Sequence, residues 1–448
     1  MLVSFSIANW RIFRDEVTFF MIATSEKQNK ETVAVVPSIG VNILPVAAIY
    51  GGNASGKTSL VKGLAFMQDF ILRGTLPDAS INIEPFILDE NFSAKPSTFK
   101  VQILVQDKCY ELSFSADSRK IHEERLVQIL KTTEKELYYR DGQKFRFNAA
   151  LIKDKRLEFI SQGTRENQLF LTNSVSQNIE RQQPIFKSIY DWFKEQLTII
   201  LPQSQFRGFD KFMQEADPLS EKVNAILPSL DMGIVALEGI SVNIDTIGLP
   251  LSFLQKLKSL SEGQSVNIKT TSGDMIVVKN ENGTLNAKKL MAKHLKVNGE
   301  FSFFHIQDES DGSKRCIDLL PIFVDLIAEK SSKVYIIDEI DHSLHTELLI
   351  DLLKFYLGYC EPSKRSQLIF TTHNLLTMDQ NLLRRDEMWA TERNAKGYAA
   401  LIAFGDYKDI RSDKDICKSY RQGRLGGIPK IRLDAVMIEQ EDHSEQKA

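Results

Sequence analysis

Residues 46–60, VAAIYGGNASGKTSL, decide the fold. The first five are an apolar run of the kind found in buried parallel strands, and 59–72 carry helical periodicity. Between these segments, GGNASGKT fits the pattern G-x-x-x-x-G-K-[ST] without a mismatch. Because a loop of this kind between a strand and a helix encloses phosphate with its backbone N–H groups, we predict that the chain binds a nucleoside triphosphate.

The residue types in the loop indicate what each does. Gly51 and Gly56 let the backbone approach phosphate, Lys57 reaches the β- and γ-phosphates, and the Thr58 hydroxyl ligates magnesium. ATP and Mg²⁺ are therefore the expected cofactors. The predicted ATP-binding residues are Gly51, Gly52, Asn53, Ala54, Ser55, Gly56, Lys57, Thr58 and Ser59.

Two further apolar runs end in polar residues suited to the same chemistry. In VYIIDEIDHSLH (334–345), Asp338 could hold magnesium through water and Glu339 could polarise the attacking water. In LIFTTHN (368–374), the apolar run ends near His373, which could sense a γ-phosphate. Since open α/β sheets bind ligands at the carboxyl ends of their strands, we predict that Glu339 and His373 are catalytic and that Thr58 and Asp338 bind the metal.

The turn ESDGSKRCID (309–318) stands directly before an apolar helical run. Taken alone it is best explained as an N-cap by Ser310 or Asp311, and phosphate binding at the helix start is the alternative. In a single ATPase core the turn would lie far from its own phosphate loop. It gains a role if two copies pack face to face, so that each helix start caps the γ-phosphate of the other.

The rest of the chain indicates an α/β fold with two kinds of sheet. Short alternating segments over 96–148 predict an antiparallel meander, and helix–strand alternation over 313–372 predicts a parallel sheet covered by helices. We therefore expect a P-loop ATPase head with an inserted, mainly helical lobe. The expected division is 1–155 and 301–430 for the two halves of the head, 156–300 for the insertion, and 431–448 for an acidic, disordered tail.

Composition sets limits on location and partners. The four cysteines are scattered without a CxxC pair, which predicts a reduced, cytoplasmic chain without structural zinc. No apolar run approaches the roughly 20 residues of a membrane span, so no membrane partner is expected. The net charge is −3, which favours no general attraction to nucleic acid. The basic segment 285–296 is interpreted as a solvated helix face, with a binding patch as the alternative.

The order of these motifs resembles that of ABC-type ATPases of the SMC, RecF and OLD branch, whose signature turn works across a dimer. The resemblance narrows to AAA-family ATPases of abortive-infection and phage-defence systems, most like the ATPase subunit of PARIS-type systems, with Septu-type ATPases as the close alternative. It covers roughly 1–150 and 300–430. The segments that carry it are LVSFSIANWRIFRDEVTF, LPVAAIYGGNASGKTSL, SDGSKR, DEIDHSLH, TTHNLLTMDQNLLRRDEMW and IRSDKDICKSYRQGRLGGIP.

This resemblance implies that the turn is a signature motif acting in trans, with the cap as its local geometry. The implied residues are Ser310, Asp311, Gly312, Ser313 and Arg315. Two positions depart from the usual pattern: Ser313 replaces the second signature glycine, and His345 replaces an aspartate that often closes the following loop. Arg11 stands where related proteins often place a cation near the phosphates, and an exposed surface arginine is the other interpretation.

The implied function is an ATP-hydrolysing subunit that senses a phage-derived trigger and holds or releases a separate effector, expected to be a nuclease. The implied partners are a second copy in a face-to-face dimer, a possible higher homo-oligomer, and that effector. A DNA-clamping repair ATPase of the RecF or SMC kind is the alternative, in which DNA binds directly. Only 75 residues follow His373, too few for the nuclease domain that OLD enzymes append, so the chain itself is not expected to cut nucleic acid.

Overall fold

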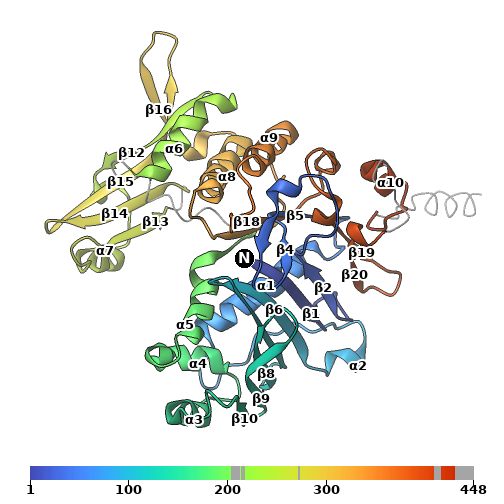
Figure 1. Ribbon diagram of the computed structural model, residues 1–448. Helices are drawn as coiled ribbons and strands as arrows, with labels where there is room; N and C mark the ends of the chain where they lie inside the picture. The colour runs from blue at the N-terminus through green and yellow to red at the C-terminus, as the bar shows by residue number, and fades with distance from the viewer. Residues whose placement is uncertain (203–211, 213–216, 271–272, 408–414, 429–448) are drawn as a thin grey trace, which may run out of the picture.

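The computed structural model describes residues 1–202, 212, 217–270, 273–407 and 415–428. Three large sheets and one two-stranded sheet organise them (Figure 1). The acidic tail expected at 431–448 lies outside the described residues. None of the helices in the described ranges is both long and apolar enough to cross a bilayer.

The central sheet has the strand order β11-β17-β18-β5-β19-β20, and every neighbouring pair is parallel except β19 and β20. Its strands are β5 (Val46–Gly51), β11 (Leu197–Ile200), β17 (Val334–Ile337), β18 (Gln367–Thr371), β19 (Met388–Arg393) and β20 (Ala399–Ala403). Strand β5 lies in the middle and is buried along its whole length. This arrangement confirms the parallel core predicted from the apolar runs.

Helices cover both faces of this sheet. Ala47 and Ile49 of β5 belong to the same hydrophobic core as α1 (Lys57–Arg73). Val46, Ala48 and Tyr50 belong instead to the core that contains α8 (Asp311–Ile327) and α9 (Thr346–Leu357). Since successive side chains of a strand point to opposite faces, α1 covers one face and α8 and α9 cover the other.

A seven-stranded antiparallel sheet packs on the outer side of α1. Its order is β10-β9-β8-β7-β6-β1-β2, and Phe66 and Phe70 of α1 contact the rings of Phe99 and Phe114 at centroid distances of 5.0 and 5.5 Å. The meander expected at 96–148 is confirmed. The strands are β1 (Leu2–Ala8), β2 (Val17–Phe20), β6 (Ser97–Val105), β7 (Lys108–Ala116), β8 (Ile121–Ile129), β9 (Glu134–Asp141) and β10 (Lys144–Phe147); the short β3 (Ala34–Val36), β4 (Val41–Ile43) and α2 (Glu90–Ser93) lie nearby in sequence.

Residues 155–200 pack with this first half of the head. Helices α3 (Lys155–Gln162), α4 (Phe170–Ser176) and α5 (Pro184–Asp191) place buried residues in the core that α1 shares with the meander, and the following β11 joins the central sheet. The segment that stands apart with its own sheet therefore begins later than the expected boundary at 156.

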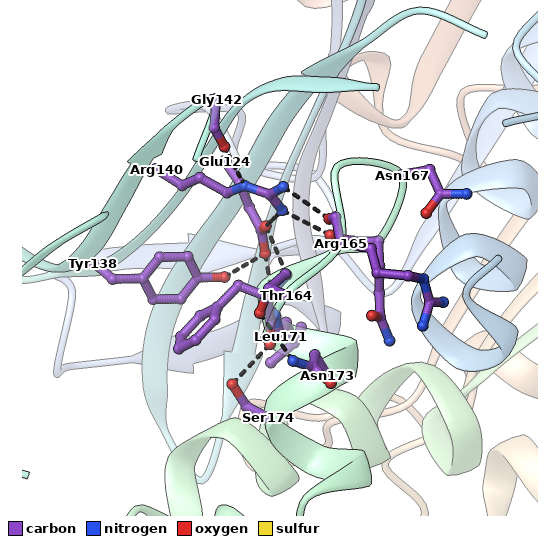
Figure 2. Close-up of polar contacts among 12 residues, drawn as sticks. Glu124, Tyr138, Arg140, Gly142, Thr164, Arg165, Asn167, Leu171, Asn173 and Ser174 are labelled. Atoms are coloured by element: carbon purple, nitrogen blue, oxygen red, sulfur yellow. Dashed lines mark hydrogen bonds and ion pairs between the residues drawn. The ribbon is translucent and has the colours of Figure 1, made fainter. Parts of the chain in front are cut away.

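A buried ion pair fixes α4 to the meander (Figure 2). Glu124 of β8 and Arg140 of β9 are both fully buried and lie 3.4 Å apart, and the Tyr138 hydroxyl donates to the Glu124 carboxylate at 2.7 Å. The same carboxylate accepts the N–H groups of Phe170 and Leu171 at the start of α4, at 2.8 and 3.2 Å. The Arg140 guanidinium also donates to the carbonyls of Gly142, Arg165 and Gln168.

The inserted lobe is less helical than expected. It is built on a sheet of order β12-β15-β14-β13, and β16 also pairs with β15. Helices α6 and α7 lie near this sheet (Figure 1). The elements are α6 (Pro218–Ile226), β12 (Ile234–Val242), α7 (Leu251–Lys258), β13 (Ser265–Lys269), β14 (Met275–Glu281), β15 (Thr284–Leu295) and β16 (Phe301–His305); α10 (Ile416–Arg421) lies near the C-terminal end of the described chain.

The expectation of a helix face at the basic segment 285–296 is wrong, because this segment forms most of β15. Its spacing suits a helix, but pairing with β12, β14 and β16 decides the local structure. Lys289, Lys293 and Lys296 form ion pairs with Asp274, Glu238 and Glu300 respectively, at 2.7, 2.7 and 3.5 Å. These lysines are largely neutralised within the chain, which weakens the case for a nucleic-acid patch.

The ion pair in Figure 2 leads to a stability prediction. Arg140→Met should lower the free energy of unfolding of the first half of the head by about 3–5 kcal/mol, because it leaves the Glu124 carboxylate buried without its cation. The matched control is Arg146→Met, since Arg146 pairs with Glu136 at the surface and its side chain is 69% exposed. That change should cost less than about 1 kcal/mol. Urea unfolding measures both, and equal losses would contradict the assignment.

Candidate nucleotide-binding site

The loop between β5 and α1 has the backbone that phosphate binding requires. Gly51 and Gly56 have φ of 150° and 121°, values that residues with a side chain rarely adopt. A Cβ added to Gly51 would lie 2.5 Å from Thr391 Oγ1, and one added to Gly56 would lie 3.0 Å from a ring carbon of Phe13. Helix α1 begins without a side-chain cap, so its first N–H groups are left to face a ligand.

Lys57 is a buried cation near two carboxylates. The residue is 5% exposed, and its ammonium donates to the carbonyls of Gly51 and Gly52 at 2.9 and 3.1 Å. Burial lowers the pKa of Lys57, while the nearby carboxylates of Asp338 and Glu339 oppose that shift. The predicted phosphate-binding lysine and the predicted acidic pair are therefore close enough to interact electrostatically.

One hydroxyl arranges both acidic residues. Thr371 Oγ1, at the end of β18, donates to Asp338 Oδ1 at 2.6 Å and accepts the Glu339 N–H at 2.8 Å. Asp338 is completely buried, and its Oδ2 has no hydrogen-bond partner among the described residues. A buried carboxylate oxygen of this kind suits a hydrated Mg²⁺, and Thr58, as the second residue of α1, supplies a hydroxyl on the neighbouring loop.

His373 follows β18 at the same edge. Its N–H donates to Asp341 Oδ2 at 3.2 Å, which fixes the backbone at this point. Burial, with a smaller contribution from the Lys57 cation, lowers the pKa of His373 below its usual 6.5. The imidazole is therefore neutral at neutral pH and can donate or accept a hydrogen bond.

One cavity of about 740 Å³, within the usual size range of small-molecule sites, lies among these groups. Residues 53–59 of the phosphate loop line it together with Glu339 and His373, whereas the predicted site residues Gly51, Gly52 and Asp338 do not. Arg11 also lines it and forms an ion pair with Glu84 at 2.8 Å, so this arginine lies at the site and not on an unrelated surface. Its contact with phosphate stays a prediction.

The rest of the cavity lining could not be predicted from the sequence. It comes from three separate segments, which carry no nucleotide-binding motif and meet only in the folded chain. The residues are Ile12, Glu84, Pro85, Phe86, Ile87, Leu88, Arg393 and Gly397. Gly397, in the turn between β19 and β20, is the closest to a local signal, since its φ is 86°.

The signature turn, residues 310–315, does not line this cavity as the structure describes it. Ser310 caps α8 by accepting the Ser313 N–H at 3.0 Å, so the cap geometry is confirmed. Ser310 and Asp311 are exposed. Gly312 lies close to Ser343, since a Cβ added to Gly312 would lie 3.1 Å from the Ser343 carbonyl oxygen. Arg315 is different: it is 7% exposed and donates to the Glu339 carbonyl at 3.2 Å.

Residues 46–379 match the family model described as "AAA domain, putative AbiEii toxin, Type IV TA system". Two solved structures are similar at low identity. "SMC head domain from Thermotoga maritima" is 13% identical with a TM-score of 0.36, covering 90% of this chain and 98% of that chain. "Crystal structure of the SmcHead bound to the C-winged helix domain of ScpA" is 14% identical with a TM-score of 0.39, covering 90% and 96%. No curated protein matches. Because the family model spans most of the chain, the protein belongs to this AAA family of P-loop ATPase domains.

Proposed function

We propose that this protein is an ABC-type ATPase subunit of an anti-phage defence system, which binds ATP with Mg²⁺ and hydrolyses it slowly. The observation that carries the proposal is the cavity at which the phosphate loop, Glu339 and His373 meet. The adjacent Asp338 has an oxygen without a hydrogen-bond partner among the described residues. The defence role is supported by the description of the matched family and by the resemblance to PARIS-type and Septu-type ATPases.

The residues divide the chemistry between binding and water activation. The loop N–H groups and Lys57 bind the β- and γ-phosphates, while Thr58 and Asp338 would hold the magnesium ion, which neutralises phosphate charge. The Glu339 carboxylate polarises the attacking water, and the neutral His373 imidazole lies where it can contact the γ-phosphate.

A second copy of the chain is the proposed source of a further contact to the nucleotide. The exposed start of α8 does not line its own cavity, so it would cap the γ-phosphate bound by a partner in a face-to-face dimer. Such a composite site gives the associated and separated states different affinities for ATP. That difference is what allows nucleotide to shift an assembly.

Contacts with the inserted lobe support a sensing role. His294 of β15 lies 2.7 Å from Glu309, the residue before the signature turn, and Gln307 donates to the Gly273 carbonyl at 2.6 Å. Lys314 of the turn reaches back to the Gln307 carbonyl at 3.4 Å. A trigger or effector that binds the inserted lobe would thus act on the segment that precedes α8. The effector is proposed to be a separate nuclease, and the trigger to be phage-derived.

Direct DNA clamping is less favoured, because three lysines of the basic segment already pair with carboxylates. A DNA titration over a range of salt concentrations tests this alternative. A steep loss of affinity with salt would favour a clamp, since each neutralised phosphate releases counterions.

Lys57→Ala should weaken ATP binding by at least about tenfold, because one charged hydrogen bond to phosphate contributes roughly 1.5–3 kcal/mol. Lys62→Ala is the matched control, since Lys62 is on the same helix and outside the cavity lining. Calorimetry measures both dissociation constants. Equal affinities for the two variants would refute the assignment of the phosphate loop.

Glu339→Gln should retain ATP binding and lose about 10²–10⁴-fold in turnover, because the amide cannot accept the proton of water. Thr371→Val should also lower turnover, since it removes the hydroxyl that orients Asp338 and Glu339, while Thr371→Ser should keep most of the activity. Phosphate release and the Mg²⁺ concentration for half-maximal rate are the measurements. Wild-type turnover in Glu339→Gln would show that Glu339 has no part in hydrolysis.

A further inference from the structure

Arg315 is placed unlike the other residues of the signature turn. Ser310 and Asp311 are exposed at the start of α8, whereas Arg315, about one turn further along, is 7% exposed. Its Nη2 donates to the carbonyl of Glu339 in the same chain at 3.2 Å, and its buried Nε has no hydrogen-bond partner in the described part of the chain. The side chain is therefore turned into its own subunit, away from the exposed helix start.

The residue that it contacts has an unusual backbone. Glu339 has φ of 51°, a left-handed conformation that a residue with a side chain adopts only when its surroundings hold it there. Three contacts hold its backbone, one of them the His342 N–H, which donates to the Glu339 carbonyl at 3.0 Å. The Thr371 hydroxyl accepts its N–H at 2.8 Å, and Arg315 donates to its carbonyl.

Three carboxylates near Arg315 stabilise its positive charge in this buried place. The carboxylates of Asp318, Asp341 and Glu339 all lie near enough to favour its charged form, although burial lowers its pKa. Arginine stays protonated in proteins, so the guanidinium remains a cation beside the reacting glutamate. Burying the Arg315 cation costs desolvation free energy. A role in holding the Glu339 backbone in place would explain why the chain bears that cost.

We infer that Arg315 is a positioning residue that acts in cis: it ties the first turns of α8 to the backbone of Glu339 within one subunit. This inference rests on the proposed ATPase function and assigns Arg315 a different role from Ser310, whose proposed contact is with the partner's γ-phosphate. It also gives α8 a direct mechanical connection to the water-activating carboxylate. A displacement of the helix start would then move Glu339.

Single variants test the positioning role. Arg315→Met should leave the ATP dissociation constant within about twofold of wild type and lower turnover by roughly 10- to 100-fold, the effect of losing one charged hydrogen bond at the reacting glutamate. Arg315→Lys should recover part of the rate. In the Glu339→Gln background, Arg315→Met should cause little further loss, because residues that act as a unit are not additive.

Mixed dimers distinguish action in cis from action in trans. A Lys57→Ala chain has no working phosphate loop but offers an intact signature turn to its partner. Mixed with Ser310→Arg, whose own loop and Glu339 are intact, it should restore activity. Mixed with Arg315→Met it should not, because the only chain with a working loop then has a displaced Glu339.

The possible outcomes separate the two proposals. Restored activity with Arg315→Met, equal to that with Ser310→Arg, would place Arg315 in trans and overturn the inference. Loss of ATP binding by both Arg315→Lys and Arg315→Met would also overturn it, since Arg315 would then be a structural residue. Failure of the Ser310→Arg mixture, with exchange of subunits verified, would instead count against the composite site itself.

Discussion

The register between β5, β18 and β17 determines where the predicted site residues at the ends of these strands lie. Thr371 pairs with Ile49 and Phe370 with Ile337, so the phosphate loop and the acidic pair leave the same edge of the sheet, on either side of β18. The Thr372 N–H continues this pairing by donating to the Ile49 carbonyl at 3.1 Å. Because a shift of one residue would turn each side chain to the opposite face, the site exists only in this register. The apolar cores on both faces hold the strands in it.

Within that frame, short hydroxyl contacts do the fine positioning. Thr371 serves the acidic pair, and Thr391 of β19 does the same for the phosphate loop, with its Oγ1 2.6 Å from Ser55 Oγ. Both threonines are completely buried. A buried hydroxyl that lacks its partner is costly, so each contact favours one arrangement of the loop that it touches.

Sequence patterns predicted the features that depend on neighbouring residues. The phosphate loop, the acidic pair, His373 and the meander are local strings. The meander is confirmed, and the loop, Glu339 and His373 meet at one cavity, while their chemical roles stay predictions. What failed depends on distant pairing. The side chains of the segment that forms β15 have a spacing that suits a helix, yet the segment is a strand that pairs with β12, β14 and β16. Nothing near Glu124 in the chain indicates that its carboxylate accepts N–H groups from Phe170 and Leu171. The lining that residues 84–88, Arg393 and Gly397 add to the cavity could not be predicted for the same reason, because these segments meet only in the folded chain.

Helix α8 connects the inserted lobe with the backbone of Glu339. Its start follows Glu309, which the inserted lobe holds through His294, and its first turns reach the Glu339 backbone through Arg315. A helical turn is stiff over this distance, since each N–H is bonded to the carbonyl four residues earlier. Glu339 itself is in a strained conformation that requires contacts on both sides. Under the proposed function, a change at the inserted lobe would need to move only one rigid element to alter the glutamate, and hydrolysis would then respond to events outside the cavity.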